Sequence, residues 1–393
     1  MATQSPLPYE GLRVLDISQG IAGPYCAHIL WQQGADVIKV EPPAGDWIRF
    51  VGVTTSGKQS ALSIQFNAGK KGLALDARTD AGKKILRELA LEADVIVQNF
   101  RPGVADRMGV GYDELSKLKP ELVYVSVSGY GPDGPYADAP ATDSVMQADS
   151  GLMFSNQDEN GVPRRFGVLA ADVVTGMYAS QGAATALYQR LARKVGTHVQ
   201  VSLFEACAAF QAPCFIEEAI AGKRRFGAVS APNAVFATSD GAISIVVLND
   251  DQFGRLCRAL GREDWQSDPR FLDNPLRFAN REVLHDALRA LTQKNTTAYW
   301  SELFKKHDVL HAPVRDYQGV LNHPQALHLK MTQQLEQAGI GTLPYIGLPS
   351  HPHHRPVESA PAIGEHSEQI LRQAGISTEQ IQQLIETGVV LQA

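Results

Sequence analysis

The sequence is poor in cysteine and carries no large excess of charge of either sign. Its four cysteines, Cys26, Cys207, Cys214 and Cys257, form no CxxC pair and no zinc-ligand spacing. Neither a disulfide framework nor a structural zinc site is therefore expected. The net charge is −6 and no strongly basic block is present, so binding to nucleic acid through phosphate neutralisation is not expected either.

Long hydrophobic runs are also missing. No stretch reaches about 18 consecutive apolar residues, the length that a membrane-spanning helix needs, so we expect no membrane span. The first residues, MATQSPLPYEGL, lack the basic and apolar segments of a signal peptide. A cytoplasmic protein with free thiols is the simplest expectation. The composition, with 44% hydrophobic and 20% charged residues, is that of an ordinary soluble protein.

Strand and helix signals alternate along the first half of the chain. The expected strands are residues 13–17, 36–40, 72–75, 94–97 and 122–127, and two expected helices are residues 24–34 and 79–92. Short β-rich runs separated by helices are typical of βαβ units. We therefore predict an α/β fold, with a large Rossmann-like domain built on a mostly parallel sheet.

The pattern changes near residue 225. Residues 233–248 predict two strands joined by a turn at Ser239–Gly241, and residues 251–260 and 281–307 predict helices. This mixture indicates a smaller α+β domain. The expected division is a large domain of residues 1–200 and 325–393, a small domain of residues 225–315, and linkers at residues 201–224 and 316–324.

The C-terminal part begins with residues 343–361, which are rich in proline and histidine. We expect them to form a long surface connection. Two short helices should follow, at residues 367–374 and 378–386, the second of them capped by Ser377.

Asp172 is the only charged side chain in the run from Phe166 to Tyr188. A carboxylate in apolar surroundings is costly unless it is paired, so its pKa tends to rise. Two interpretations stay open: an N-cap of a helix that runs from Val173 onward, and a reactive carboxylate. They are compatible, because a helix N-terminus helps to keep a carboxylate ionised and nucleophilic.

Several motifs of other protein classes almost match. Residues 129–134 fit GxGxxG, but Pro132 prevents the helix that should follow, so a turn is expected. Residues 52–59 resemble a phosphate-binding loop, but Gln59 stands where Ser or Thr should hold magnesium. The histidines of residues 351–354 lack partners at ligand spacing, and no GxSxG motif is present. We therefore expect no metal ion and no hydrolase elbow.

Two loops carry residues that suit a phosphorylated, adenine-bearing ligand. Residues 99–103 (NFRPG) follow a strand end, where ligands bind in open α/β sheets. With Arg107 and Met108 they offer an amide, an aromatic ring and arginines for stacking and charge-assisted hydrogen bonds. Residues 67–71 (NAGKK) form a second basic loop. For both segments the alternative of an ordinary polar loop stays open.

Four sequence blocks together resemble the class III CoA-transferases, the formyl-CoA transferase and carnitine CoA-transferase family that includes the α-methylacyl-CoA racemases. They are residues 11–43 (GLRVLDISQGIAGPYCAHILWQQGADVIKVEPP), 99–111 (NFRPGVADRMGVG), 125–151 (VSVSGYGPDGPYADAPATDSVMQADSG) and 172–197. Residues 361–366 (PAIGEH) are similar to a C-terminal signature of the family. The resemblance covers nearly the whole chain.

The resemblance implies a fold, an assembly and a reaction. Family members have a large Rossmann-like domain made from both chain ends, a smaller domain between them, and two chains that interlock as rings in a homodimer. The family aspartate aligns with Asp172. It implies covalent transfer of CoA from an acyl-CoA to a small carboxylic acid through aspartyl anhydride and aspartyl-CoA intermediates. CoA thioesters are then the substrates, and no permanently bound cofactor, metal or ATP is implied.

The resemblance also implies CoA contacts. The matching positions are Asn67, Lys70, Asn99, Phe100, Arg107 and Met108, with Gly23 and Pro24 near the pantetheine and thioester. Acceptor contacts are expected in the unmatched residues 44–66, which include Trp47, Arg49 and Lys58.

Departures from the family pattern bear on the choice of reaction. Family racemases use a His-Asp pair, and here the pair reads Thr142-Asp143. Proton transfer on both faces of an α-carbon then lacks one partner, so a transferase is preferred and a racemase is the alternative. A CoA-binding protein without activity is a third possibility, and the retained Asp172 speaks against it. Ile21 stands where oxalate enzymes carry Gln, which puts oxalate in doubt as the acceptor.

Overall fold

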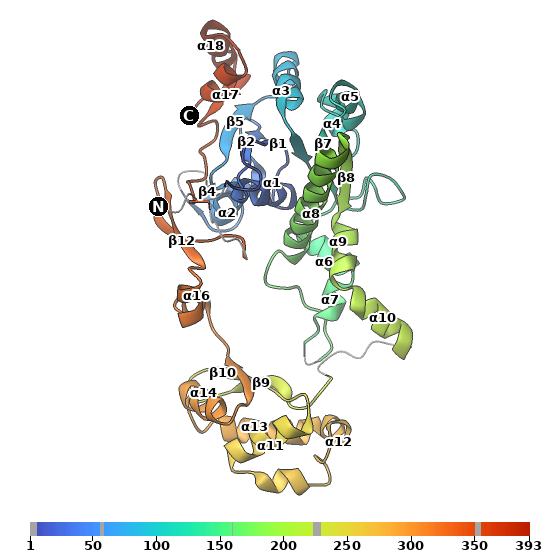
Figure 1. The fold of residues 1–393 in the computed structure, drawn as a ribbon, viewed down its shortest axis with the longest axis vertical. Coiled ribbons are helices and arrows are strands. Elements are labelled where there is room, and N and C mark those ends of the chain that lie inside the picture. The colour runs from blue at the N-terminus through green and yellow to red at the C-terminus, as the bar shows by residue number, and fades with distance from the viewer. Residues whose placement is uncertain (1–5, 56–58, 159, 223–228, 350–354) are drawn as a thin grey trace. The chain divides into compact units, whose positions relative to one another are not determined.

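The computed structural model describes residues 6–55, 59–158, 160–222, 229–349 and 355–393 (Figure 1). The chain forms two compact units, one of Met1–Lys223 with Lys330–Ala393 and one of Arg224–Leu329. Both ends of the chain belong to the first unit. Each unit has a hydrophobic core of its own.

A seven-stranded sheet forms the centre of the first unit, in the order β14-β5-β2-β1-β6-β7-β8. Its strands are β1 (Arg13–Asp16), β2 (Asp36–Glu41), β5 (Lys71–Leu75), β6 (Val95–Gln98), β7 (Val123–Ser128), β8 (Thr197–Ser202) and β14 (Val390–Leu391). All neighbours pair in parallel except β14, which is antiparallel to β5. The predicted α/β class with a mostly parallel sheet is therefore confirmed.

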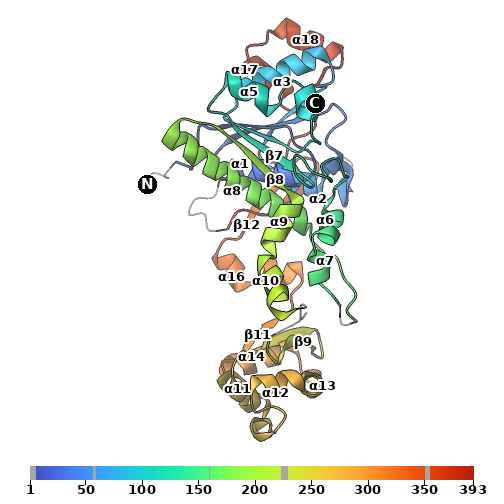
Figure 2. The same ribbon diagram turned by 90° about the vertical axis from the view of Figure 1, so that its right-hand side faces the viewer.

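Helices cover both faces of this sheet (Figure 2). On one face lie α1 (Ala22–Gln32) and α8 (Ala170–Arg193), packed against the valines of the central strands. On the other face lie α3 (Asp80–Glu92), α5 (Tyr112–Leu118), α17 (Ser367–Gln373) and α18 (Thr378–Glu386). Strand β7 shows why both faces are buried, because Val123, Val125 and Val127 point to the first face and Tyr124 to the second.

The C-terminal segment departs in part from its expected course. Strands β12 (Thr332–Gln337) and β13 (Gly341–Ile346) form an antiparallel hairpin. The expectation that the surface connection starts at residue 343 is therefore wrong, because Tyr345 is buried against Ile64 and Ala360. The predicted C-terminal helices are present as α17 and α18. Ser377 and Gln380 form the capping box at the start of α18, as the sequence indicated.

The second unit packs helices against a small antiparallel sheet. Strands β9 (Asn233–Ala237) and β10 (Ala242–Val246) form the predicted hairpin, and β11 (Leu310–Pro313) pairs with β10. The predicted helix of residues 251–260 is present as α11 (Asp250–Leu260). The single helix predicted over residues 281–307 is wrong, because it is divided into α13 (Arg281–Thr292) and α14 (Thr297–Lys306), the second capped by Thr296. Helix α12 (Asn274–Ala279) lies between α11 and α13. Phe236, Leu256 and Leu284 lie in the core that these elements share.

Shorter elements carry the loops around the sheet. In the first unit they are η1 (Trp47–Phe50), β3 (Thr54–Thr55), β4 (Gln59–Ser60), α2 (Ala61–Asn67), α4 (Val104–Arg107), α6 (Asp143–Asp149), α7 (Leu152–Ser155), α9 (Leu203–Phe210) and α10 (Ala212–Ala221). The second unit also contains η2 (Glu263–Ser267), α15 (Tyr317–Leu321) and α16 (Pro324–His328). Within the described ranges, no helix has both the length and the hydropathy to cross a membrane.

Candidate functional site

Asp172 lies in the first turn of α8, half-buried, and it is not the N-cap. The helix begins at Ala170, with Leu169 at the cap position and no cap hydrogen bond from its side chain. Asp143, the first residue of α6, accepts the free backbone N–H groups instead: its Oδ1 lies 2.9 Å from Ala171 N and 3.3 Å from Asp172 N. The predicted cap is thus wrong, because a carboxylate distant in the sequence satisfies these donors.

Gln147, one turn further along α6, holds Asp143 in this position. Its Nε2 donates to Asp143 Oδ2 at 2.7 Å and to the carbonyl of Val168 at 3.1 Å. Its Oε1 accepts the backbone N–H of Phe166 at 2.9 Å. Both Asp143 and Gln147 are buried. One amide therefore connects the capping carboxylate to the segment that leads into α8.

The surroundings of Asp172 disfavour its charged form. Burial and, after it, the negative charge of Asp143 raise the pKa of Asp172 to about 7. The rise that apolar surroundings predict is confirmed. The expectation that the helix N-terminus keeps this carboxylate ionised is wrong, because Asp143 takes up the N–H groups and adds a like charge. A carboxyl group with such a pKa suits acid–base or nucleophilic chemistry near neutral pH.

The start of α1 packs beside the start of α8. Ile21 lies in a small apolar cluster that Leu169 and Val173 contact. Further along α8, a Cβ on Gly176 would lie 2.8 Å from the carbonyl oxygen of Ala22. Only glycine permits this approach of the two helices. The residues around Asp172 are therefore held by α1, the helix that also carries Gly23 and Pro24.

Gly23 and Pro24 are buried in the first turn of α1. A Cβ on Gly23 would lie 2.4 Å from Ser18 Cβ, so no larger residue fits. The carbonyl of Pro24 accepts a hydrogen bond from Lys70 Nζ at 2.8 Å. These contacts define the course of the loop between β1 and α1. The predicted contact of Gly23 and Pro24 with a thioester stays a prediction.

Lys70 and Asn67 lie inside the unit. Lys70 Nζ lies 2.8 Å from Asp16 Oδ2 and 3.1 Å from Asn67 Oδ1. Burial lowers the pKa of Lys70 to about 8. Both residues therefore have internal partners beneath the β1–α1 loop, and their predicted contact with CoA stays a prediction.

A second buried cation supports the same loop. Lys39 Nζ donates to the carbonyl of Ser18 and lies 3.1 Å from Asp46 Oδ2. Asp46 in turn accepts the backbone N–H of Gly20. With the pair Lys70–Asp16, these residues form a buried ionic network of two cations and two carboxylates.

Asn99 connects the loop after β6 to the loop after β1. Its Oδ1 accepts Gln19 N at 2.7 Å and its Nδ2 donates to Gln19 O at 2.6 Å. Phe100 and Met108 follow, and both line a cavity of about 210 Å³ beyond the carboxyl ends of β1, β2 and β5. Ligands of open α/β sheets bind at such an edge. We call this the Phe100–Met108 cavity.

One basic residue of this cavity was not predicted from the sequence. Arg78 lines it, next to Leu75 and Ala77 at the end of β5, and its guanidinium forms an ion pair with Asp76. The run Asp76-Ala77-Arg78 directly after a predicted strand was the signal that could have identified it. Arg107 is exposed on the short helix α4 and is not among the lining residues.

The expected acceptor segment divides into different environments. Arg49 is buried in a pair with Glu41, at 2.6 Å and 2.8 Å, and also contacts the carbonyl of Pro361. Trp47 is half exposed, and a Cβ on Gly20 would lie 2.5 Å from its ring. Lys58 lies outside the described residues. Of these three side chains, Trp47 is the one that the structure describes as exposed to solvent. Arg49 is buried and stabilises the loop through Glu41.

No candidate metal centre is present among the described residues, since no group of three or more His, Cys, Asp or Glu side chains is placed to hold an ion. The histidines of residues 351–354 lie outside the described ranges.

Comparison with known proteins gives a consistent result. The model of the family described as CoA-transferase family III matches residues 9–367. Acetyl-CoA:oxalate CoA-transferase of Acetobacter aceti is 35% identical over 368 residues, which cover 91% of this chain and 93% of that protein. Succinyl-CoA:glutarate CoA-transferase of Homo sapiens is 31% identical and covers 98% of this chain and 90% of its own.

Solved structures agree with the fold. A CAIB/BAIF family protein from Brucella suis superposes with a TM-score of 0.85 at 31% identity, over 94% of this chain and 100% of that chain. Rv3272 from M. tuberculosis, in its orthorhombic form, superposes with a TM-score of 0.82 at 28% identity, over 92% and 99% of the two chains.

Proposed function

Since the chain belongs to CoA-transferase family III, we propose that it transfers CoA from an acyl-CoA thioester to a small carboxylic acid, with Asp172 as the covalent nucleophile. The observation that carries this proposal is the half-buried carboxyl group of Asp172, whose pKa is raised to about 7 at the start of α8. A group that is partly ionised at neutral pH and partly desolvated is suited to nucleophilic attack.

The proposed reaction proceeds by four displacements on carbonyl carbons. The Asp172 carboxylate attacks the donor thioester, forms a mixed anhydride and releases the CoA thiolate. The thiolate attacks the aspartyl carbonyl, releases the donor acid and leaves an aspartyl-CoA thioester. The acceptor carboxylate attacks this thioester, gives a second anhydride and frees the thiolate again. The thiolate then takes the acceptor acyl group, so the new acyl-CoA leaves and Asp172 is restored.

Asp143 has a defined place in this proposal as a positioning residue. It holds the backbone of Ala171 and Asp172 through Oδ1, and its charge adds to the effect of burial in raising the pKa of Asp172. Acylation of Asp172 removes one of two neighbouring negative charges. The repulsion is therefore present in the free enzyme and relieved as the covalent bond forms, which favours the step that makes the intermediate.

We further propose that the nucleotide part of CoA lies in the Phe100–Met108 cavity. Its volume of about 210 Å³ and the Phe100 ring suit a stacked adenine. Arg78 at the same cavity and the exposed Arg107 nearby in the sequence supply guanidinium groups for phosphates. Asn99 acts by holding the two loops together through Gln19.

A transferase is favoured over a racemase by the residue before Asp143. Thr142 carries no group that can exchange a proton near neutral pH, so a base for the second face of the α-carbon is missing at this position. The relatives named above are oxalate and glutarate enzymes. Short mono- and dicarboxylic acids are therefore the acceptor class that we propose to test.

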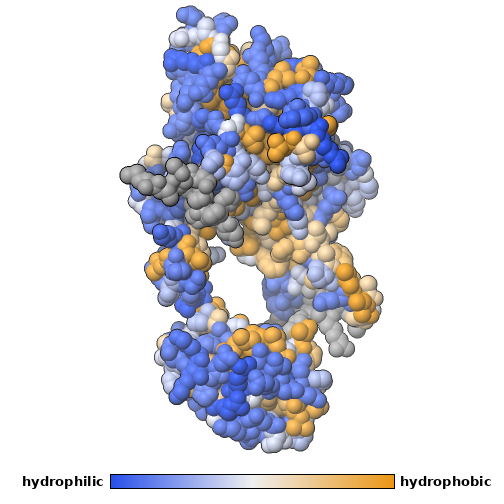
Figure 3. All heavy atoms as spheres, in the orientation of Figure 1, coloured by the Kyte–Doolittle hydropathy of each residue, from blue (hydrophilic) through white to orange (hydrophobic). Residues whose placement is uncertain are grey.

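We also propose that the protein is a homodimer. Helix α10 has no buried residue. Its apolar side chains Phe215, Ile216 and Ile220 are 54%, 62% and 82% exposed. Figure 3 shows apolar side chains gathered over this helix. An apolar helix of this kind is normally covered by a partner, and a second copy of the chain is the partner that the family resemblance implies.

Intact-mass measurement tests the covalent role directly. The protein is incubated with acetyl-CoA or succinyl-CoA, with and without a panel of short carboxylic acids. We expect a CoA-sized adduct that Asp172→Ala abolishes and that one acid discharges. Asp80→Ala is the matched control, because Asp80 is an exposed carboxylate in the first turn of α3. An adduct that persists in Asp172→Ala contradicts the proposal.

A further inference from the structure

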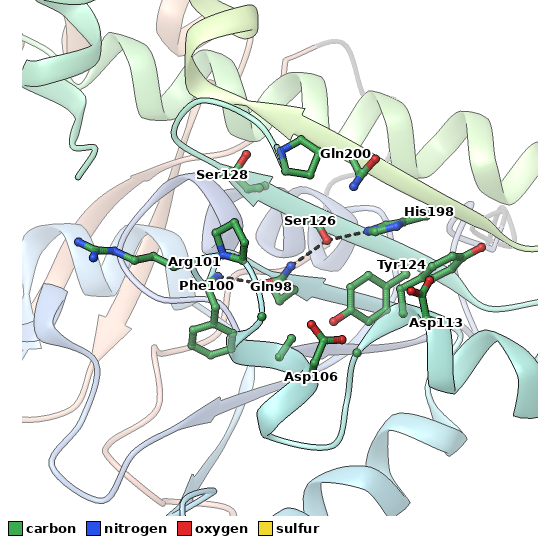
Figure 4. Close-up of a pocket in the computed structure, with 17 residues that line it drawn as sticks. Gln98, Phe100, Arg101, Asp106, Asp113, Tyr124, Ser126, Ser128, His198 and Gln200 are labelled. Carbon is green, nitrogen blue, oxygen red and sulfur yellow. Dashed lines mark hydrogen bonds between the residues drawn. The ribbon is translucent and has the colours of Figure 1, made fainter. Parts of the chain in front are cut away.

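A second cavity of about 200 Å³ opens at the carboxyl ends of β6 and β7 and beside β8 (Figure 4). It shares Phe100 with the Phe100–Met108 cavity and no other lining residue. Nothing in the proposed transfer reaction uses it. We call it the Ser126 cavity, after the residue at the centre of its floor.

The floor of the Ser126 cavity is unusual for a parallel sheet. Such sheets are normally apolar on both faces, because helices cover them. Along β7 the outward side chains change from Tyr124 to Ser126 and Ser128, and β8 adds His198 and Gln200 on the same face. An uncharged, hydrogen-bonding surface therefore replaces the expected apolar one.

Three floor side chains are linked in a row, as Figure 4 shows. Gln98 Oε1 accepts Phe100 N at 2.8 Å, so its amide nitrogen is turned toward Ser126 Oγ, at 2.7 Å. Ser126 Oγ lies 2.8 Å from His198 Nε2. The His198 ring stacks on Tyr112 at 4.3 Å, and burial lowers its pKa. The row is thus neutral and held in place before any ligand arrives.

The rim of the Ser126 cavity is acidic. Asp106 and Asp113 both line it. Among the described residues, neither side chain has a hydrogen bond or ion pair to another side chain. Arg101 also lines the cavity, but its guanidinium points away from the floor residues (Figure 4). This rim therefore disfavours phosphates and carboxylates, which argues against CoA and the acid substrates as ligands of this cavity.

We propose that the Ser126 cavity binds a neutral ring that carries vicinal hydroxyl groups, as a free sugar or a nucleoside does. Carboxylates such as Asp106 and Asp113 accept hydrogen bonds from paired hydroxyls, as acidic residues do with a ribose. Ser126, Ser128 and Gln200 supply neutral donors and acceptors. The rings of Phe100 and Tyr112 provide apolar edges for the carbon face of the ligand.

The test measures binding of three probes to the full chain saturated with CoA, so that the Phe100–Met108 cavity is occupied. The probes are D-ribose, uridine and uridine 5′-monophosphate. Their binding is measured by saturation-transfer NMR and calorimetry. Ribose or uridine should bind. Comparing their affinities distinguishes a site for a free sugar from a site for a nucleoside. The monophosphate should bind at least about tenfold more weakly, because its charge meets the acidic rim.

Variants locate the site. Ser126→Ala removes the centre of the row, and the double change Asp106→Asn with Asp113→Asn removes the rim charge. Each should weaken binding of the neutral probe by about tenfold, the usual effect of one lost charge-assisted or buried hydrogen bond. Asp80→Asn, an exposed carboxylate elsewhere in the same unit, should have no effect. Unchanged CoA binding and melting temperature show that each variant is folded.

Three results overturn the proposal. One is the absence of saturable binding of both ribose and uridine. Another is binding of the monophosphate as tightly as uridine. The third is affinity that stays unchanged in both Ser126→Ala and the double variant. None of them bears on the covalent role of Asp172, which the mass measurement tests separately.

Discussion

At the scale of single residues, the pair Asp143 and Asp172 sets the expected pH dependence. In the proposed reaction the reactive form of Asp172 is the carboxylate, and its pKa is raised to about 7 by burial and, after it, by the charge of Asp143. Asp143→Asn keeps an oxygen for the N–H groups of Ala171 and Asp172 but removes that charge. We expect the acid limb of the kcat/KM profile to move to lower pH. An unmoved limb would show that Asp143 acts on structure alone.

The same pKa has a consequence for stability. Because the folded-state pKa of Asp172 lies above its ordinary value of 3.8, the contribution of this one group to stability is greatest below that value and is lost as the pH rises through 7. Asp172→Asn removes this cost. We expect the variant to be more stable than the parent by on the order of 1–2 kcal/mol at pH 8, with little difference at pH 4.

Thermal unfolding at the two pH values measures this effect, with Asp80→Asn as the exposed control. A gain in stability that is equal at both pH values would contradict the pKa argument.

Sequence reasoning identified Asp172 as the reactive candidate from its isolation in an apolar run, and the raised pKa followed from the same observation. It did not identify the partner. Asp143 is 29 positions from Asp172 in the chain, and no periodicity connects a residue of α6 to the first turn of α8. Lys70 is similar, because its buried partner Asp16 lies 54 positions away.

At the scale of elements, the contact between α1 and α8 holds the site together. A Cβ on Gly176 would lie 2.8 Å from the carbonyl oxygen of Ala22 and 2.9 Å from the Tyr25 ring. Gly176→Val must therefore push the two helices apart. We expect a loss of about 2–4 kcal/mol in the free energy of unfolding, the usual range for a large clash in a packed core.

Gly167→Ala is the control for this change, since nothing lies within 4 Å of a Cβ at Gly167. Denaturant unfolding of both variants measures the difference. Equal stability of Gly176→Val and the parent protein would show that α8 is free to shift.

Elements with a strong local period were predictable. Strands β1, β2, β6 and β7 and helix α3 lie within a residue or two of their expected bounds, because β-branched runs and an amphipathic face specify them. The hairpin strand β13 was not predicted, since the proline and histidine content of residues 343–361 indicated a surface connection. Its pairing with β12 and the burial of Tyr345 are tertiary effects.

At the scale of the whole molecule, the proposed dimer rests on the exposed apolar side of α10. If a second copy covers it, placing charges there should break the dimer. We expect Ile216→Asp with Ile220→Asp to halve the molar mass in light scattering after gel filtration. Leu118→Asp is the control, because Leu118 is 57% exposed on α5. A monomeric parent protein, or a double variant that stays dimeric, contradicts the dimer proposal.

Fold class and family were readable from the whole sequence because several blocks agreed with one architecture. The identity of the acceptor acid could not be predicted from the sequence. We expect acceptor recognition to depend on side chains that loops bring together, and of the predicted contacts Arg49 is turned inward to Glu41. The domain boundaries proposed from composition stay predictions.

The buried ionic network of Lys39, Asp46, Asp16 and Lys70 limits which substitutions these positions can accept during evolution. A charge that loses its partner in such a place costs several kcal/mol, whereas replacing both partners together is often neutral. Selection should therefore remove single substitutions at these positions, and the substitutions that are tolerated should occur in pairs. In a library selected for function, substitutions at Lys70 are expected to appear only together with substitutions at Asp16.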